Sequence, residues 1–122
     1  MTSDKKMLIE AATIASRLKS NDRKVDLRSF LLGAVGLRAD GVFVSSRNIA
    51  APDCAPQHHA EARLVRKLTP SSCVWVARVR RKDGDWGLAK PCPGCQRLLR
   101  SSGVKRVVYT IAPGEWGVID MS

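Results

Sequence analysis

Two short segments of this chain carry the residue types that can hold a catalytic metal ion. One is His59-Ala60-Glu61, and the other is Pro91-Cys92-Pro93-Gly94-Cys95. A catalytic zinc ion takes three protein ligands and keeps its fourth position for water. His59, Cys92 and Cys95 can supply the three ligands, and Glu61 lies close enough to His59 in the sequence to move a proton on and off that water. Together the two segments predict a metal-assisted hydrolytic reaction.

The combination of the two segments is more specific than either half. A Cys-x-x-Cys pair alone also occurs in redox proteins and in structural zinc sites, and both are alternatives here. A structural site needs a fourth protein ligand, and the candidates Cys54, Cys73 and His58 form no second pair with metal-ligand spacing. The complete pattern H-x-E…P-C-x-x-C is the signature of zinc-dependent nucleobase deaminases. We therefore expect one catalytic Zn²⁺ per chain.

The composition bounds the class of protein. A chain of 122 residues can bury a core without disulfides, so residues 1–122 are expected to form a single domain. Cys54 and Cys73 are expected to stay reduced, which suits the cytoplasm, with a second metal at Cys54 and His58 as an alternative. No apolar run reaches the length of a membrane span, and residues 1–6 lack a signal-peptide core. We expect a cytoplasmic protein with no membrane partner.

The charge of the chain is strongly positive. Lys and Arg outnumber Asp and Glu by 21 to 11, for a net charge of +10. Such a charge favours anionic partners, either a nucleotide phosphate or a nucleic-acid backbone, over a neutral one. The basic residues are spread along the chain, and Arg78, Arg80, Arg81 and Lys82 form its one dense run. A solvated basic surface without a specific partner is the alternative.

Hydrophobic periodicity and turn residues predict an α/β chain in the order α-β-β-α-β-α-β-β. Apolar residues recur at spacings of three and four between Met7 and Leu18, which predicts a first helix that Ser3 or Asp4 caps. The other expected helices span 60–68 and 92–102, and the expected strands span 30–37, 42–45, 73–80, 104–111 and 116–119. The second and third helices are expected to form right-handed crossovers between parallel strands. Both halves of the metal site then lie at the carboxyl ends of strands, where helix N-termini favour thiolate.

From Phe30 to Ile119 the chain resembles the cytidine/deoxycytidylate deaminase superfamily. The two zinc motifs carry this resemblance, together with Leu32-Gly33-Ala34-Val35 and the block from Gly103 to Tyr109. The resemblance implies a three-layer α/β/α fold with a five-stranded mixed sheet and helices on both faces. It also implies hydrolytic deamination, with Glu61 as the catalytic residue, and assembly into a homo-oligomer.

The resemblance also points to residues that contact the substrate. Asn48 lies eleven residues before His59, like the family asparagine that binds the sugar, although a turn residue is the alternative. The backbone N–H of Ala60 is expected to bind the base carbonyl. Trp86 and Trp116 are expected to flank the site and stack on a base, or else to cover the edge of the core. Arg47 and Lys90 are the candidates for phosphate contacts.

The signals for the substrate conflict. Nucleoside deaminases usually have cysteine where this chain has His59, and glutamate where it has Ala50, whereas histidine is more typical of deoxycytidylate and nucleic-acid-editing enzymes. Residues 110–114 are too few for a helix, so the last two strands are expected to pair as an antiparallel hairpin, as in nucleoside deaminases and some bacterial toxin deaminases. We expect conversion of a cytosine nucleoside or nucleotide to its uracil form, with dCMP as the first candidate, then deoxycytidine or cytidine. The alternatives are a deaminase that edits cytosine, or less favourably adenine, in DNA or RNA, and a non-catalytic zinc-binding module.

Overall fold

The computed structural model describes residues 3–16, 31–48, 60–80 and 83–121. The described helices are α1 (Asp4–Ser16), α2 (Ala60–Val65) and α3 (Pro93–Ser101), and the described strands are β1 (Leu31–Leu37), β2 (Phe43–Arg47), β3 (Cys73–Val79), β4 (Trp86–Gly87), β5 (Arg106–Ala112) and β6 (Glu115–Asp120). The order predicted from the sequence is confirmed, with β4 as an added strand. Ser3 caps α1, because its hydroxyl lies 3.4 Å from the backbone N–H nitrogen of Lys6 and its carbonyl accepts the N–H of Met7.

All the described strands belong to one mixed sheet. Its order is β2-β1-β3-β5-β6, with β4 paired to β3 beside this path. Strands β3 and β5 are parallel, and α3 connects them as predicted. Strands β2 and β3 are both antiparallel to β1, so they run in the same direction with β1 between them. The predicted hairpin of β5 and β6 is antiparallel, which is also confirmed.

The sequence predicts five strands, and β4 makes six. This strand is only 2 residues long, which is too short to leave a periodic pattern. Trp86 pairs with Val79 and Gly87 pairs with Arg78, and the backbone N–H of Arg80 donates to the carbonyl of Asp85 across the turn. The segment that leads to Cys92 is therefore held against the sheet before α3 begins.

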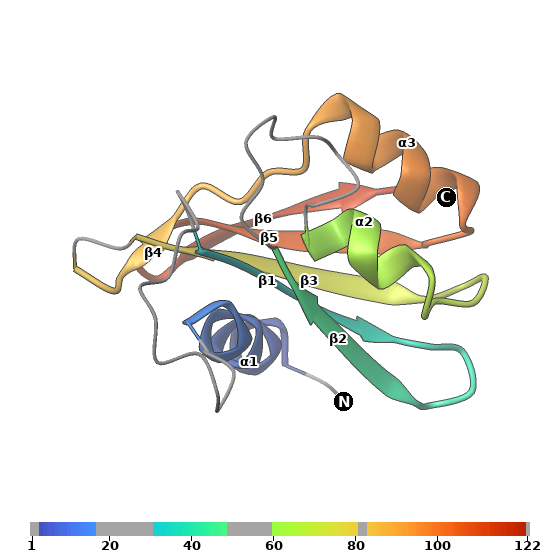
Figure 1. The fold of residues 1–122 in the computed structure, drawn as a ribbon, viewed down its shortest axis with the longest axis horizontal. Coiled ribbons are helices and arrows are strands. Elements are labelled where there is room, and N and C mark those ends of the chain that lie inside the picture. The colour runs from blue at the N-terminus through green and yellow to red at the C-terminus, as the bar shows by residue number, and fades with distance from the viewer. Residues whose placement is uncertain (1–2, 17–30, 49–59, 81–82, 122) are drawn as a thin grey trace.

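Helices cover both faces of the sheet, so the predicted three-layer fold is confirmed. Helix α1 lies on one face, and α2 and α3 lie side by side on the other (Figure 1). Because side chains alternate along a strand, Val74 and Val76 pack on the α2 and α3 side, whereas Trp75 and Ala77 pack against α1. The two faces thus carry two separate hydrophobic clusters. None of the described helices has the length and apolar character needed to cross a bilayer.

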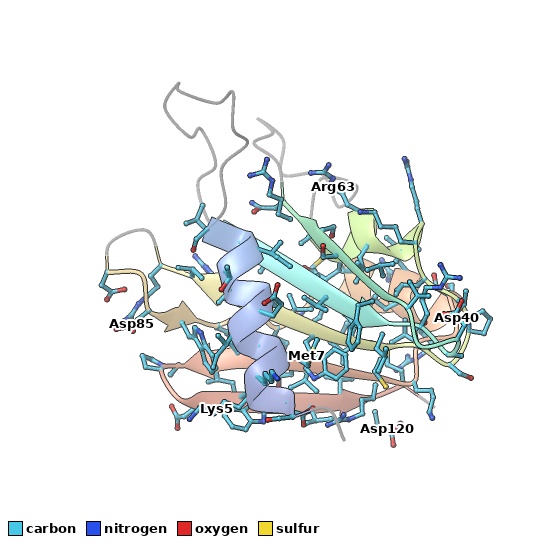
Figure 2. The ribbon with its side chains drawn as sticks, turned by 90° about the horizontal axis from the view of Figure 1, so that it is seen from below. Lys5, Met7, Asp40, Arg63, Asp85 and Asp120 are labelled. Carbon is cyan, nitrogen blue, oxygen red and sulfur yellow. The ribbon has the colours of Figure 1, made fainter. Side chains whose placement is uncertain are left out.

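Helix α1 approaches the sheet most closely at Gly33. Figure 2 looks onto this face and shows α1 lying across the strands. A Cβ atom added to Gly33 would lie 2.7 Å from the backbone nitrogen of Ala15 and would collide with the carbonyl oxygen of Ala11. Both alanines are fully buried. The small residues on the two elements therefore set the spacing between α1 and β1.

We expect Gly33→Ala to destabilise the protein strongly, because the neighbouring atoms belong to a helix backbone that cannot move without repacking the cluster. Overpacking of a core costs roughly 1–3 kcal/mol, and this change should reach the upper end. The matched control is Gly36→Ala, whose nearest neighbour would be the flexible end of Leu68 at 2.6 Å. Urea unfolding of both variants measures the difference. Equal losses of unfolding free energy would contradict this account of the helix contact.

Asp4 links α1 to two strands. Its carboxylate accepts a hydrogen bond from the indole Nε1 of Trp75 at 2.9 Å and one from the guanidinium of Arg106 at 2.6 Å. Burial raises the pKa of Asp4, but the hydrogen bonds from Arg106 and Trp75 and the charge of Arg106 outweigh it, so the pKa lies below its ordinary value of 3.8. Since Trp75 is 2% exposed, this contact fixes the start of α1 over the core.

The lowered pKa of Asp4 predicts a pH-dependent contribution to stability. The stabilisation is fully present above the ordinary value of 3.8 and is lost as the pH falls through the lower folded-state pKa. We expect Asp4→Asn to lose about 1 kcal/mol at neutral pH, a modest value because Arg106 is partly solvated. Urea unfolding at neutral pH and near pH 3 tests this. If the difference in unfolding free energy between wild type and Asp4→Asn stays constant or grows on acidification, the stabilising role of the Asp4 carboxylate is contradicted.

Candidate active site

Three side chains, one from β2, one from α2 and one from the turn after α2, hold α2 against the end of β2. The hydroxyl of Ser46 donates to the carbonyl of Ala60, and the guanidinium of Arg63 donates to the carbonyl of Arg47 at 2.9 Å. The ammonium of Lys67 donates to the carbonyl of Ser45 at 2.7 Å. These bonds connect the two elements at successive residues of β2. They place Glu61 in the first turn of α2, above the sheet.

The second half of the site is the N-terminus of α3. Cys92 is the N-cap with an extended backbone, and Pro93 follows at the first helical position, where its missing N–H costs nothing. The side chain of Gln96 donates to the carbonyl of Pro91 at 2.8 Å. The backbone N–H of Gln96 donates to the backbone carbonyl of Cys92 at 2.9 Å. Cys95 then lies in the first turn with no exposed surface. The Cys-x-x-Cys pair is thus presented from one helix terminus, as predicted.

Glu61 meets the cysteine pair across the space between α2 and α3. The Glu61 carboxyl and the Cys95 thiol share a hydrogen bond, and Cys95 is also hydrogen-bonded to Cys92. Glu61 is 2% exposed, and its Oε1 has no hydrogen-bond partner among the described residues. A buried carboxylate oxygen without a partner is costly, so it is expected to have a function.

Burial dominates the electrostatics of these groups. Desolvation raises the pKa of Glu61 to about 7, against smaller opposing effects of hydrogen bonds from Cys95 and the backbone. Desolvation also raises the pKa of the Cys95 thiol, as do the charge of Glu61 and the hydrogen bond with Cys92. Without a cation the pocket therefore favours neutral groups. A divalent metal ion inverts this preference, because a coordinating thiol is deprotonated.

The described residues fit a zinc ion in the nature of their donor atoms. Two thiols of a Cys-x-x-Cys pair are common zinc ligands, and a helix N-terminus favours their thiolate form. The unpartnered Oε1 of Glu61 fits a water or substrate proton beside the metal. The predicted third ligand, His59, lies outside the described residues. Within the described ranges no three His, Cys, Asp or Glu side chains are arranged to hold a metal by themselves.

A cavity of about 150 Å³ opens beside Glu61 and Cys92. The residues that line it are Leu32, Glu61, Arg78, Leu88, Ala89, Lys90 and Cys92. Lys90, a predicted phosphate contact, is therefore at the site. Arg78 is also there, and it was not among the predicted site residues. The alternation of β3 carries the signal, because Arg78 lies on the same face as Val74 and Val76.

Asn48 and Ala60 lie close to this cavity. Asn48 is 3% exposed, and its Oδ1 accepts the backbone N–H of Leu32 at 2.9 Å while its own N–H donates to the Leu32 carbonyl at 3.0 Å. The side-chain oxygen thus joins the end of β2 to β1. Ala60 is fully buried as the first residue of α2. Arg47 is half-buried at the end of β2 and does not line the cavity.

The structure does not bring the two tryptophans to the site. Trp86 and Trp116 contact each other edge to face, with ring centroids 6.4 Å apart and an interplanar angle of 70°. Trp86 packs against the hydrophobic cluster under α1, on the face of the sheet opposite to α2 and α3. This position fits the alternative stated above, in which they cover the edge of the core. Proximity in sequence to Cys92 misleads here, because alternation along β4 decides which face a side chain occupies.

A buried glutamate thus lies beside a Cys-x-x-Cys helix terminus, on a mixed sheet between helical layers. A family model described as the cytidine and deoxycytidylate deaminase zinc-binding region matches residues 1–111, and the chain belongs to this family. The family match also implies zinc as the metal. No curated protein sequence matches the chain.

Solved structures of cytidine deaminases share the fold. The enzyme from Burkholderia pseudomallei is 17% identical, with 98% of this chain and 94% of that chain covered and a TM-score of 0.66. The enzyme from Mycobacterium leprae is 19% identical, with 99% and 95% covered and a TM-score of 0.63. The enzyme from Mycobacterium tuberculosis is 17% identical, with 93% and 90% covered and a TM-score of 0.56. At these identities the likeness shows the fold alone.

Proposed function

We propose that this chain is a zinc-dependent hydrolytic deaminase that converts the cytosine of a nucleoside or nucleotide to uracil with release of ammonia. dCMP is the first candidate substrate, followed by deoxycytidine and cytidine. The observation that carries the proposal is the buried Glu61 carboxyl, hydrogen-bonded to Cys95 and with Oε1 unpartnered among the described residues. Glu61 and Cys92 also line one cavity. An acid–base group, metal-ligating thiols and a space for substrate thus meet at one point.

His59, Cys92 and Cys95 would hold one zinc ion per chain. When bound, zinc supplies a Lewis acid that makes water a nucleophile at neutral pH. Glu61 takes a proton from the attacking water and transfers it to ring N3 of cytosine. The water oxygen bonds to C4, the C4–N4 bond breaks, and Glu61 transfers the second water proton to the leaving amine. One cytosine and one water thus become one uracil and one ammonia.

Other residues of the chain would bind and orient the substrate. The Ala60 backbone N–H, at the start of α2, would donate to the base carbonyl, and the Asn48 side chain would bind the sugar. Lys90 contributes a cation at the cavity. Arg47 is the last residue of β2 and lies outside the cavity lining. The thiolate ligands suit a reducing compartment, so we place the protein in the cytoplasm, as one domain that assembles into a homo-oligomer.

Deamination of cytosine within a nucleic acid is the second candidate function. The observation that favours it is the net charge of +10. Binding through phosphate contacts weakens steeply with salt, since each neutralised phosphate releases counterions. An editing enzyme would therefore bind single-stranded oligonucleotides with a strong salt dependence and leave free nucleosides unchanged.

A substrate panel separates these candidates. Zinc-loaded protein is incubated with cytidine, deoxycytidine, their monophosphates, single- and double-stranded DNA, RNA and the adenine counterparts, and products are identified by mass spectrometry. We expect uracil products from free nucleotides, dCMP foremost. Turnover of polymers alone would make this an editing enzyme. A zinc-loaded protein inactive on every member of the panel would contradict the proposed function.

A further inference from the structure

The mouth of the active-site cavity is positively charged. Among the described residues that line it, Arg78 and Lys90 are basic, and Glu61 is the one acid. Glu61 is buried, whereas Arg78 and Lys90 are exposed. The cavity thus has an acid at its inner end and two cations at the solvent side. The cytosine base carries no anionic group that would pair with two cations. The two cations therefore indicate that another, anionic part of the substrate lies at the mouth of the cavity.

One buried residue fixes the backbones that carry both cations. Thr110 of β5 has no exposed surface, and its hydroxyl accepts the backbone N–H of Arg78 at 3.1 Å and donates to the carbonyl of Gly87 at 2.8 Å. Its carbonyl accepts the N–H of Ala89, next to Lys90, at 2.9 Å. The two cations therefore extend from backbone segments tied to the same point of the sheet. Because these backbone segments are already fixed, the two side chains lose less conformational entropy when they bind an anion.

The side chains of Arg78 and Arg80 both lie over Gly87 of the short strand β4. Arg78 and Gly87 are paired in register. A Cβ atom at Gly87 would lie 3.3 Å from Cγ of Arg80, and 3.5 Å from Cδ and 3.6 Å from Cγ of Arg78. The aliphatic stem of Arg78 therefore runs along β4 on its way to the cavity.

Arg80, which directly follows the last residue of β3, has acidic partners outside the cavity. Its guanidinium pairs with Asp83 through bonds of 2.8 and 3.1 Å, and Asp85 lies 3.9 Å away. Arg80 is not among the residues that line the cavity. Arg80 is thus held by acids of its own turn, whereas Arg78 lines the cavity.

We propose that Arg78 and Lys90 bind a phosphate group of the substrate, so that the site selects a cytosine nucleotide over the free nucleoside. This inference rests on the proposed function, which places the base beside Glu61. Arg and Lys are the side chains that recognise phosphate, Arg through paired hydrogen bonds and Lys as a point charge. Two cations match one phosphate, whereas a nucleic-acid track needs several phosphate contacts. A 5′-monophosphate is therefore the favoured source of the group.

The test compares Arg78→Gln, Lys90→Gln and the double variant with Arg80→Gln, which removes the same charge two residues away, just after the end of β3. For each we measure kcat and KM with dCMP, deoxycytidine and a short single-stranded oligonucleotide with one cytosine. We expect the preference for dCMP over deoxycytidine to fall roughly 10- to 100-fold in each single variant, through KM, as for loss of a charged hydrogen bond. Arg80→Gln should keep the wild-type preference.

A binding measurement separates failure of this inference from failure of the proposed function. Calorimetry compares dUMP with deoxyuridine on zinc-loaded wild type and on Arg78→Gln, and needs no turnover. Tighter binding of dUMP that Arg78→Gln removes supports phosphate recognition even if no substrate is deaminated. A preference for the nucleotide that survives in the double variant, or equal binding of dUMP and deoxyuridine to wild type, overturns it. Dependence on both cations for the oligonucleotide and not for dCMP would identify a phosphodiester as the source of the phosphate.

Discussion

Glu61→Gln is expected to abolish deamination while the protein stays folded and retains zinc. Glutamine keeps the shape of the side chain but cannot carry protons from the water to N3 and to the leaving amine. General acid–base catalysis contributes roughly 10²- to 10⁴-fold, so kcat should fall by at least that range. Stability should not decrease, because Oε1 of Glu61 has no partner among the described residues and an amide avoids the burial of a charge.

Steady-state kinetics, zinc content and thermal unfolding of the same preparation measure all three quantities. Glu61→Ala should show the same loss of kcat as Glu61→Gln. Glu115→Gln removes an equal charge from an exposed position on β6 and should match wild type throughout. An active Glu61→Gln enzyme with full zinc content would exclude Glu61 as the proton carrier. Loss of zinc together with activity would instead make Glu61 a ligand.

Cys95→Ser is expected to remove bound zinc and, with it, activity. Cys95 is fully buried at the start of α3, and no other described cysteine except Cys92 shares its surroundings. Loss of an outer-shell partner alone costs roughly 10- to 100-fold in metal affinity, so loss of a ligand should cost more than about 100-fold. Because a metal bound to the native state raises stability by mass action, chelation should lower the Tm of wild type and leave that of Cys95→Ser nearly unchanged.

Cys73→Ser is the matched control for the ligand variants. Cys73 is half-buried at the start of β3 and packs against the cluster under α1, away from α3. Its zinc content and activity should equal those of wild type, although a small loss of stability is expected. Cys92→Ser should follow Cys95→Ser. Zinc that remains bound in both variants at wild-type affinity would contradict the assignment of the Cys-x-x-Cys pair.

The features that the sequence predicted well are those with a strong local pattern. The alternation of β3 and the helical spacing after Met7 each extend over several residues, so they predicted these elements and the faces that they bury. The motif at Cys92 predicted the helix terminus that presents the cysteines, because Pro93 and the ligand spacing leave few other backbone paths. The parallel pairing of β3 and β5 followed from the intervening helix.

The features that were missed depend on contacts between distant segments. Strand β4 exists because residues 86–87 pair with the end of β3, and no property of two residues alone indicates that. Arg78 belongs to a dense basic run that the sequence linked only to anionic partners in general, with a solvated surface as the alternative. The structure shows that this arginine lines the cavity. Trp86 was placed by its distance along the chain from Cys92, although it packs on the opposite face of the sheet. The Asn48 side chain accepts a hydrogen bond from the backbone of Leu32. The spacing between Asn48 and His59, which suggested a sugar contact, does not predict this bond.

The most direct test of the account is deamination in water labelled with heavy oxygen. Zinc-loaded wild type and Glu61→Gln are each incubated with dCMP, cytidine and a cytosine-containing oligonucleotide, and the products are weighed by mass spectrometry. The account predicts uracil that carries one labelled oxygen, formed by wild type on at least one of these substrates and not by the variant, with zinc present in both proteins. Zinc-loaded wild type that converts none of them, or a variant that converts them equally fast, would contradict the claim that Glu61 and a zinc site make this chain a hydrolytic cytosine deaminase.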